Sequence, residues 1–409
     1  MSEKFYQLSP EKRLEKMTTD ESLQRFFLAR QSSEMPDLIE NYVADFKLPE
    51  GVLPDLTVNE KHYRVPMVVE EPSVVAAAAN GARMVALGGG FQEEGQSQAL
   101  VGGQLLFLDA DLDALGEYIE ANEAAIFETA ALAKPSLVAR GDGLKKVDFR
   151  IIDQRHSVLE LSVQSGKAMG ANAVNTILEA VKDVMAPFSE KLVGAILTNA
   201  GHGAEVSVSA QLPVEIVGGI KAAERIVSLS EFGKVDSDRA VTENKGIFNG
   251  LSAVLLATGN DYRAVEAAGH AFASQSGHYQ SLSSWQLSAD QKFLQGRLTL
   301  PLNIGILGGA IGALPMAQKN LELMGNPTVA ELKAIMLSVG LANNLAALKA
   351  VSGKGIQEGH MRMQARALAI QVGASGSEVN RVADRLAKEK TIDEKTATRI
   401  LGEERQHDA

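Results

Sequence analysis

Apolar positions along the chain follow the helical period in some segments and the strand period in others. Residues 73–87 (SVVAAAANGARMVAL) and 329–350 have the helical pattern over lengths that suit a packed helix. Residues 63–69 (YRVPMVV) and 101–109 (VGGQLLFLD) have the pattern of strands. The sequence therefore predicts a protein of the α+β class.

The order of predicted elements changes between about residues 104 and 211. A strand, a helix, two strands, a second helix and two further strands follow one another here, which is typical of a split βαβ unit inserted into a larger domain. The glycine-rich piece GILGGAIGA (305–313) lacks GxGxxG spacing, and no such loop follows any strand. We therefore interpret that piece as close packing or a loop, and a Rossmann fingerprint is absent.

The tetrapeptide at 352–355 (SGKG) has the composition of a hinge, because glycine tolerates the dihedral changes that hinges need. The residues after it have the pattern of a separate small helical unit. We therefore divide the chain into a large domain in two parts (1–103 and 212–355), an inserted small domain (104–211) and a C-terminal domain (356–409).

Composition and charge exclude several classes of protein. The 409 residues carry a formal net charge of -11, so binding to nucleic-acid phosphates is not expected. There is no cysteine, which excludes disulfides, a thiolate nucleophile and cysteine-ligated metal. The N-terminus lacks an apolar signal-peptide core, and the longest apolar runs are expected to break before a membrane-spanning length. We expect a soluble, cytoplasmic, enzyme-like chain that contacts neither nucleic acid nor membrane.

Candidate chemistry is concentrated at residues 236–261 (DSDRAVTENKGIFNGLSAVLLATGND). We expect a polar loop carrying Arg239 and Lys245, then a helix, and Asp261 just past the end of that helix. A straight helix would separate Lys245 from Asp261 by roughly 24 Å, so they meet only if the chain folds back. The alternative is a solvated lysine and a loop aspartate.

Three other segments carry candidate chemistry. Glu70 and Glu71 follow an apolar strand, where they could provide a proton donor near neutral pH or could be two solvated acids at a helix N-terminus. His360 could donate a proton when the hinged segment closes, or be an ordinary surface or packing histidine. Small residues in 168–177 (AMGANAVNTI) allow close approach of a ligand or of a neighbouring helix. HExxH spacing is absent, and we expect no metal site.

Seven motifs give the chain a resemblance to a known family. In chain order they are IENYVADF, PMVVEEPSVVAAA, AMGANAVNTILEAV, ENKGIFNG, ATGNDYRAVEAAGHA, SGHYQSLSSW and GIQEGHM. Over nearly its whole length the sequence resembles the class II (bacterial, soluble) HMG-CoA reductases. The order NKG, ATGND and a later GHM is the most specific part of this resemblance.

The resemblance implies a fold and a reaction. The fold is a large mixed α/β domain for dimerisation and substrate, an inserted ferredoxin-like, non-Rossmann cofactor domain and a C-terminal helical flap. The assembly is a homodimer or larger, with active sites across the interface. The reaction is the four-electron reduction of HMG-CoA to mevalonate and CoA with two NAD(P)H, in the mevalonate pathway to isoprenoids.

The resemblance also implies the site residues. The catalytic positions match the acid of EEPS, the lysine of NKG, the aspartate of GND and the histidine of GHM, and they are Glu71, Lys245, Asp261 and His360. The positions near the HMG group are Ser73, Arg239 and Asn249, with Asn199 of LTN as a weaker match. The cofactor positions are Lys134, Met169, Gly170 and Asn172.

Cofactor preference depends on the region of Lys134. An NAD-using relative is expected to place an acid there for the ribose 2′-hydroxyl, whereas Lys134 with Arg140, Lys145 and Lys146 favours the 2′-phosphate of NADPH. A solvated basic turn is the alternative, and NADH is not excluded. The family's DAMGAN pattern begins here with Lys167. Two other functions stay open, namely NAD-dependent oxidation of mevalonate in catabolism and a non-catalytic acyl-CoA-binding protein on the same scaffold.

Overall fold

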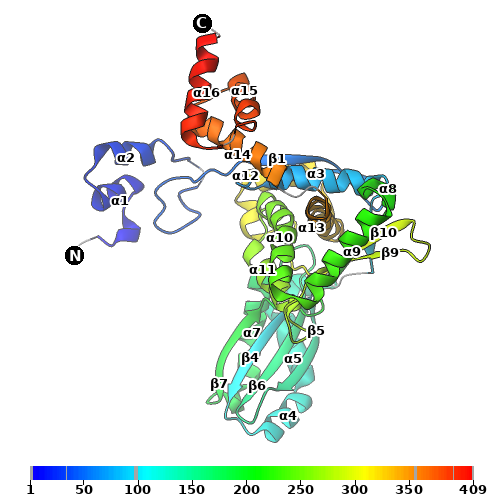
Figure 1. Ribbon diagram of the computed structural model, residues 1–409. Helices are drawn as coiled ribbons and strands as arrows, with labels where there is room; N and C mark the ends of the chain where they lie inside the picture. The colour runs from blue at the N-terminus through cyan, green and yellow to red at the C-terminus, as the bar shows by residue number, and fades with distance from the viewer. Residues whose placement is uncertain (1–2, 34, 96–99, 354–356, 390, 408–409) are drawn as a thin grey trace. The chain divides into compact units, whose positions relative to one another are not determined.

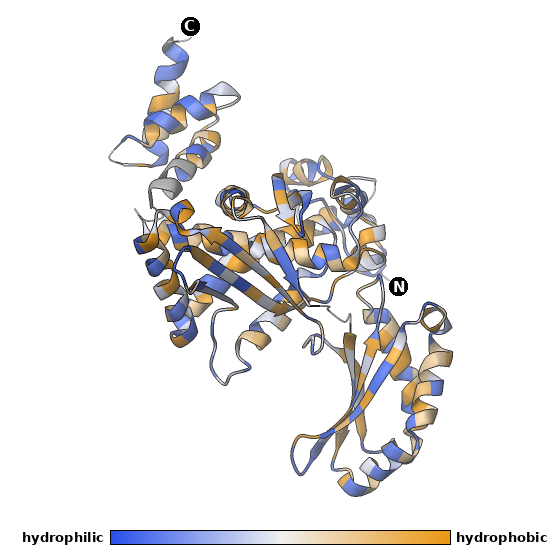
Figure 2. Ribbon diagram, turned by 90° about the vertical axis from the view of Figure 1, so that its right-hand side faces the viewer, coloured by the Kyte–Doolittle hydropathy of each residue, from blue (hydrophilic) through white to orange (hydrophobic). Residues whose placement is uncertain are grey.

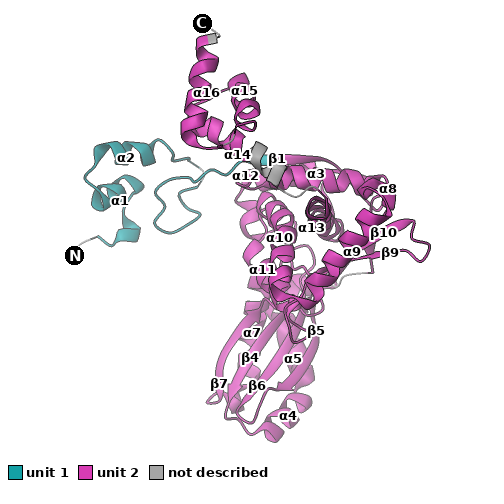
Figure 3. Cartoon of the chain, in the orientation of Figure 1, with its two compact units in different colours: residues 1–50 teal, residues 51–409 magenta. Residues whose placement is uncertain are grey.

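The structure is a computed structural model that describes residues 3–33, 35–95, 100–353, 357–389 and 391–407, without the side chains from 357 to 363. It forms two compact units, residues 1–50 and 51–409 (Figure 3). Each unit is described by itself.

The first unit is small and helical, with η1 (Phe5–Gln7), α1 (Pro10–Met17) and α2 (Glu21–Leu28). Its interior is organised by a charge as well as by apolar groups. The buried guanidinium of Arg13 donates hydrogen bonds to the carbonyl oxygens of Tyr6 and Tyr42, at 2.9 and 2.8 Å.

The second unit contains a mixed six-stranded sheet in the order β2-β1-β3-β8-β10-β9 (Figure 1). The strands are β1 (Glu50–Val58), β2 (Lys61–Val68), β3 (Phe91–Glu94), β8 (Glu205–Pro213), β9 (Ser283–Leu287) and β10 (Phe293–Pro301). The helices that accompany this sheet are α3 (Ser73–Ala86), α8 (Val214–Val217), α9 (Ile220–Val235), α10 (Ser237–Ala257), α11 (Tyr262–Ala273), η3 (Gly309–Gly312), α12 (Pro315–Leu323) and α13 (Val329–Ser352). Sheet and helices share one hydrophobic core.

The helix α13 is the centre of that core. It begins with a capping box between Thr328 and Glu331, and almost every following side chain is buried. Its length and composition would allow a membrane span, contrary to the expectation that no apolar run reaches that length, but 78% of the relevant window is buried inside the protein.

Gly81 marks the close approach of α3 to α13. A β-carbon at Gly81 would lie 2.0 Å from the carbonyl oxygen of Ala342, which is a backbone atom. We expect Gly81→Ala to destabilise the protein by about 1–3 kcal/mol, as over-packing does, and to lower Tm. The control is Gly402→Ala, since no atom of the described residues outside the local helix backbone lies within 4 Å of a β-carbon there. An unchanged Tm for the Gly81 variant would contradict this packing.

A smaller antiparallel sheet has the order β5-β6-β4-β7 and its own hydrophobic core. Figure 2 shows hydrophobic and hydrophilic residues distributed along the strands and helices of the chain. Its elements are β4 (Leu100–Leu108), α4 (Leu112–Ala121), α5 (Glu123–Ala133), α6 (Pro135–Val138), β5 (Gly143–Ile151), β6 (His156–Gln164), α7 (Ala171–Val184), η2 (Ala186–Phe188) and β7 (Leu192–Thr198). Burial alternates strictly along β4, as the period of two predicts. This βαββαβ order and sheet topology are ferredoxin-like.

The predicted C-terminal boundary of the inserted domain, at residue 211, differs from the boundary in the structure. The strand at 205–213 was expected inside the inserted unit, but β8 pairs with β3 and β10 of the larger sheet. A strand's apolar alternation shows that one face is buried and says nothing of which sheet buries it, so the sequence could not assign β8.

The C-terminal helices are α14 (Gln357–Gln371), α15 (Ser377–Leu386) and α16 (Glu394–His407). They enclose a third hydrophobic cluster, which contains only residues of this segment. The C-terminal helices therefore pack as a unit around their own core.

Candidate active site

The helix α10 carries three of the predicted site residues. Its N-cap Asp236 accepts a hydrogen bond from the amide of Asp238, and the helix continues unbroken to Ala257. The polar loop expected around Arg239 and Lys245 is therefore wrong, because both residues are helical.

Buried polar contacts explain why the polar stretch is helical. Asn244 is fully buried, donates to the carbonyl oxygen of Gln280 at 3.0 Å and accepts from the amide of Leu282 at 2.9 Å. This buried amide continues the apolar stripe of α10 toward its N-terminus. Lys245 and Asn249 lie one turn apart on the opposite, more exposed side of the helix.

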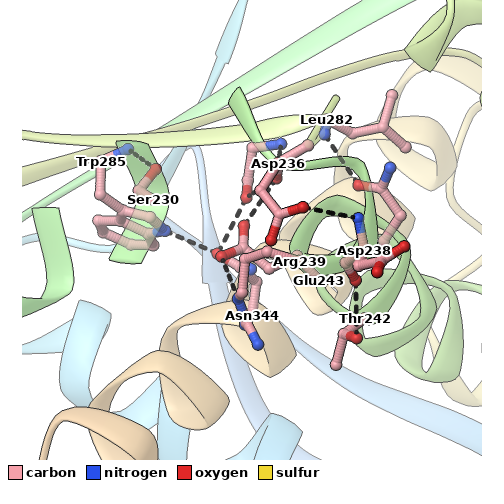
Figure 4. Close-up of polar contacts among 12 residues, drawn as sticks. Ser230, Asp236, Asp238, Arg239, Thr242, Glu243, Leu282, Trp285 and Asn344 are labelled. Atoms are coloured by element: carbon pink, nitrogen blue, oxygen red, sulfur yellow. Dashed lines mark hydrogen bonds and ion pairs between the residues drawn. The ribbon is translucent and has the colours of Figure 1, made fainter. Parts of the chain in front are cut away.

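Arg239 lies beside a buried carboxylate (Figure 4). Its Nε donates to Oε1 of Glu243 at 3.2 Å, and only 23% of the Arg239 side chain is exposed. Burial raises the pKa of Glu243, although Ser281 and Arg239 act against this shift. Sequence reasoning missed Glu243, yet its i+4 spacing from Arg239 on a helix was a usable signal.

Asp261 caps the helix that follows α10. Its Oδ1 accepts from the amides of Arg263 and Ala264, at 3.1 and 3.2 Å, and its carboxylate pairs with the Arg263 guanidinium at 3.0 Å. Partial burial opposes ionisation, but Arg263 and the backbone amides outweigh it and lower the pKa of Asp261. The aspartate is therefore held as an anion.

A single chain does not bring Lys245 and Asp261 together. Lys245 is followed by twelve residues of intact helix up to and including Ala257, which corresponds to about 18 Å. The chain turns only at Thr258, after this distance has been covered. One of the two predicted charges therefore lies along α10 and the other beyond its end.

Glu71 lies between β2 and α3, and β2 packs against α10. Its Oε1 accepts from the hydroxyl of Ser73 at 2.8 Å and from the Ser73 amide at 3.3 Å. Glu70 is exposed, so only the second acid of the pair is partly enclosed. His360 falls within the backbone of α14, and its side chain lies outside the described part of the chain.

A loop before α7 holds the predicted cofactor residues Met169 and Gly170. The hydroxyl of Ser165 donates to the carbonyl oxygen of Ala168 at 2.8 Å, and Gly170 is the N-cap of α7 with φ +99°. A β-carbon at Gly170 would lie 2.4 Å from Cβ of Ser165, so this position requires glycine. No side chain among the described residues caps α7, whose first amides can therefore receive an anion.

Strand register places other predicted residues at the same end of the small sheet. Gly143 pairs with Gln164, and Gly102 pairs with Thr198, so the ends of β6 and β7 lie together. The exposed Asn199 follows β7 directly, and Asn172 lies in the first turn of α7.

Lys134 lies at that end too, half-buried at the end of α5. It opens a turn that runs to Asp142, whose carboxylate lies against Gly166 and pairs with Arg140 at 3.5 Å. Lys146 pairs with Asp148 at 2.7 Å, so part of the basic cluster is engaged by surface acids. Sequence reasoning missed Asp142, because its contact with the loop before α7 is not local.

Two hydrogen bonds link this loop to the Asp261 region through residues 305 and 306. The amide of Gly305 donates to Oδ1 of Asn260 at 2.8 Å, and the amide of Ile306 donates to the carbonyl oxygen of Lys167 at 2.9 Å. A β-carbon at Gly305 would lie 2.7 Å from the amide nitrogen of Met169, which confirms close packing for the glycine-rich piece. Asp261 and the α7 N-terminus are therefore connected through two hydrogen bonds.

Known proteins of one family are similar to this chain over most of its length. A family model described as hydroxymethylglutaryl-coenzyme A reductase matches residues 9–365. The 3-hydroxy-3-methylglutaryl-coenzyme A reductase of Archaeoglobus fulgidus is 36% identical over 95% of this chain and 91% of its own. A probable reductase of the same name from Borreliella burgdorferi is 31% identical over 80% of this chain and 76% of its own.

A solved structure shows the same likeness. The class II 3-hydroxy-3-methylglutaryl-CoA reductase of Streptococcus pneumoniae, bound to NADPH in open conformations, is similar with a TM-score of 0.77 and 38% identity. The alignment covers 97% of this chain and 100% of that one.

Proposed function

This chain belongs to the hydroxymethylglutaryl-coenzyme A reductase family, class II, and we propose that it reduces HMG-CoA to mevalonate and CoA with two molecules of NADPH. The observation that carries the proposal is the pair of hydrogen bonds that links the loop before α7 to Asn260, the neighbour of Asp261. The link connects the loop of the candidate dinucleotide site to the residue that precedes an ionised carboxylate. The two alternatives, mevalonate oxidation and non-catalytic binding, are not favoured by the relatives.

The residues fit a dinucleotide in chemical terms. The cradle at Gly170 has no room for a β-carbon, and the uncapped amides of α7 suit a pyrophosphate. Met169 and Asn172 flank this cradle, and Lys134 lies at the same end of the sheet for a 2′-phosphate. NADPH supplies the hydride for each reduction when it is bound.

The side chains of this protein would handle charge and protons. Lys245 would stabilise the negative charge that develops on the thioester or aldehyde oxygen, with Asp261 holding its ammonium charged and in place. Glu71 would be the general acid toward that oxygen, and the Ser73 hydroxyl donates a hydrogen bond to the Glu71 carboxylate. His360 would protonate the departing CoA thiolate, because histidine is the commonest general acid in such steps.

Substrate recognition would involve α10. Arg239 would pair with the free carboxylate of HMG, and Asn249 would contact the HMG group from the Lys245 face of the same helix. Asn199, at the end of β7, would approach the substrate from the small-domain side.

The site would be completed by a second copy of the chain. One chain keeps Lys245 and Asp261 apart along α10, and the proposed chemistry needs them together. A homodimer with sites shared between the two copies satisfies both conditions. A cytoplasmic location belongs to the same proposal and is supported by the likeness to a class II reductase.

Steady-state oxidation of NADPH and NADH with HMG-CoA tests the function and the Lys134 assignment together. We expect NADPH to be preferred, and Lys134→Glu to lower that preference by about tenfold or more, or ~1.4 kcal/mol, because a carboxylate repels a 2′-phosphate. Lys146→Glu is the control, since Lys146 already pairs with Asp148.

Two results of this measurement would contradict different parts of the proposal. A wild-type preference for NADH would discard the role of Lys134 and reopen mevalonate oxidation. Absence of turnover with either cofactor, in a folded dimer, would overturn the proposed reductase function.

A further inference from the structure

Glu243 occupies an unusual position for a helix carboxylate. Its side chain has no exposed surface, yet both oxygens are bonded, Oε1 by Nε of Arg239 at 3.2 Å and Oε2 by the hydroxyl of Ser281 at 2.8 Å (Figure 4). A β-carbon on Gly233 of α9 would lie 2.8 Å from Oε2. The neighbouring helix therefore leaves room for this carboxylate by having a glycine there.

Cationic side chains from two helices lie near Glu243. Lys234 of α9 donates to the carbonyl oxygen of Ser281 at 2.7 Å, and burial lowers the pKa of Lys234 while the charge of Glu243 raises it. Two cations, Lys234 and Arg239, thus surround one carboxylate. Both favour the ionised form of the buried carboxylate, against the effect of burial.

A hydrogen-bonded chain behind Ser281 keeps the cluster rigid. The hydroxyls of Ser281 and Ser283 lie 3.2 Å apart, and Ser283 donates to Oδ1 of Asn344 in α13 at 3.1 Å. The same oxygen accepts from the indole Nε1 of Trp285 at 2.7 Å. Glu243 is therefore connected to the central helix of the large domain.

Stability alone does not account for such an arrangement. Taking an ion pair out of water costs free energy that apolar residues of similar volume would not cost, so a buried pair is weak evidence of a stabilising role. A second-layer carboxylate that fixes one edge of a guanidinium is, however, a common way to orient the rest of it. The contact is made through Nε, and among the described residues neither Nη group has a hydrogen-bond partner, so both can bind another group.

We propose that Glu243 is a positioning residue that orients Arg239 toward the free carboxylate of HMG-CoA and so selects acyl-CoA thioesters that bear this carboxylate. This inference rests on the proposed function, in which Arg239 binds that group.

The test compares HMG-CoA with its methyl ester, in which the free carboxylate is blocked. Glu243→Gln keeps the size and the acceptor for Arg239 but removes the charge. We expect KM for HMG-CoA to rise about tenfold, because Arg239 is no longer held in place by a charged partner and binds the substrate carboxylate less well. We expect kcat to stay within about twofold, because this contact is the same in the bound substrate and in the transition state. The inhibition constant of the methyl ester should stay unchanged, so the discrimination between the two compounds collapses.

Glu266→Gln is the matched control. Glu266 also accepts from a serine, Ser252, at 2.5 Å, and it joins α10 to α11 without touching Arg239. This control should keep both constants. Ser281→Ala replaces this test if Glu243→Gln fails to fold. It removes one hydrogen bond to Glu243 without changing charge, and it should raise KM for HMG-CoA by a smaller factor.

Equal losses for HMG-CoA and its ester, or a fall in kcat with unchanged selectivity, would overturn the role of Glu243 and leave it structural. Wild-type turnover is measured first, because its absence would count against the proposed function and not against Glu243.

Discussion

Lys245→Ala and Asp261→Asn should each lower kcat by about 100- to 1,000-fold, and an equimolar mixture of the two variants should recover about a quarter of wild-type turnover. Each change removes one charge from the proposed oxyanion site. The recovery follows from the geometry of α10, which holds the two residues apart within one chain.

Both substitutions leave the local structure intact. Lys245 is exposed on α10, and alanine is the best helix former at such a position. Asn is as good an N-cap as Asp, so Asp261→Asn should preserve the start of α11 while losing the charge that pairs with Arg263. Loss of turnover would therefore report on chemistry and not on unfolding.

The expected recovery is a matter of subunit exchange. In the proposed homodimer, random exchange would make about half of the dimers mixed, and each mixed dimer would have one site with both mutated residues and one site with neither. The measurement is NADPH oxidation with HMG-CoA after mild denaturation and refolding of the mixture. A mixture of Lys245→Ala with the Lys245→Ala/Asp261→Asn double variant is the control and should stay inactive.

Failure of the first mixture to recover, with exchange confirmed by a tagged subunit, would show that Lys245 and Asp261 do not meet across two copies. Substantial activity in either single variant would instead remove that residue from the catalytic set.

Local patterns predicted the elements that depend on local forces. The helices α3 and α13 and the strands β2 and β4 lie within one or two residues of their predicted ranges, because periodic burial and end signals are encoded nearby in the chain. The α+β class and the family followed from these patterns and from the motifs.

Non-local contacts were not predictable in the same way. The sheet to which β8 belongs is decided by its pairing with β10, more than eighty residues later. The link from Asn260 to Gly305 joins residues 45 positions apart, and no local spacing signals it. The helical state of Arg239 and Lys245 was missed because it depends on contacts that are distant in the sequence. Asn244 is buried on the inner side of this helix because the carbonyl oxygen of Gln280 accepts its hydrogen bond.

His360→Gln should lower turnover of HMG-CoA by about 100- to 10,000-fold, the usual range for loss of a general acid, and should leave reduction of free mevaldehyde nearly unchanged. The first reduction releases a CoA thiolate that needs a proton, whereas the aldehyde has no leaving group. The C-terminal helices α14–α16 have their own hydrophobic core, so the substitution and the removal of residues after Gly353 should leave the other cores folded.

NADPH oxidation with each substrate measures this difference, and His156→Gln is the control. His156 is exposed at the opposite end of β6 from Gln164 and pairs with Asp153. An equal loss with both substrates would mean that His360 affects closure or folding and does not protonate the thiolate. Full activity of the chain that ends at Gly353 would exclude any catalytic role for the C-terminal helices, because the proton for CoA would then have to come from the two larger domains or from water.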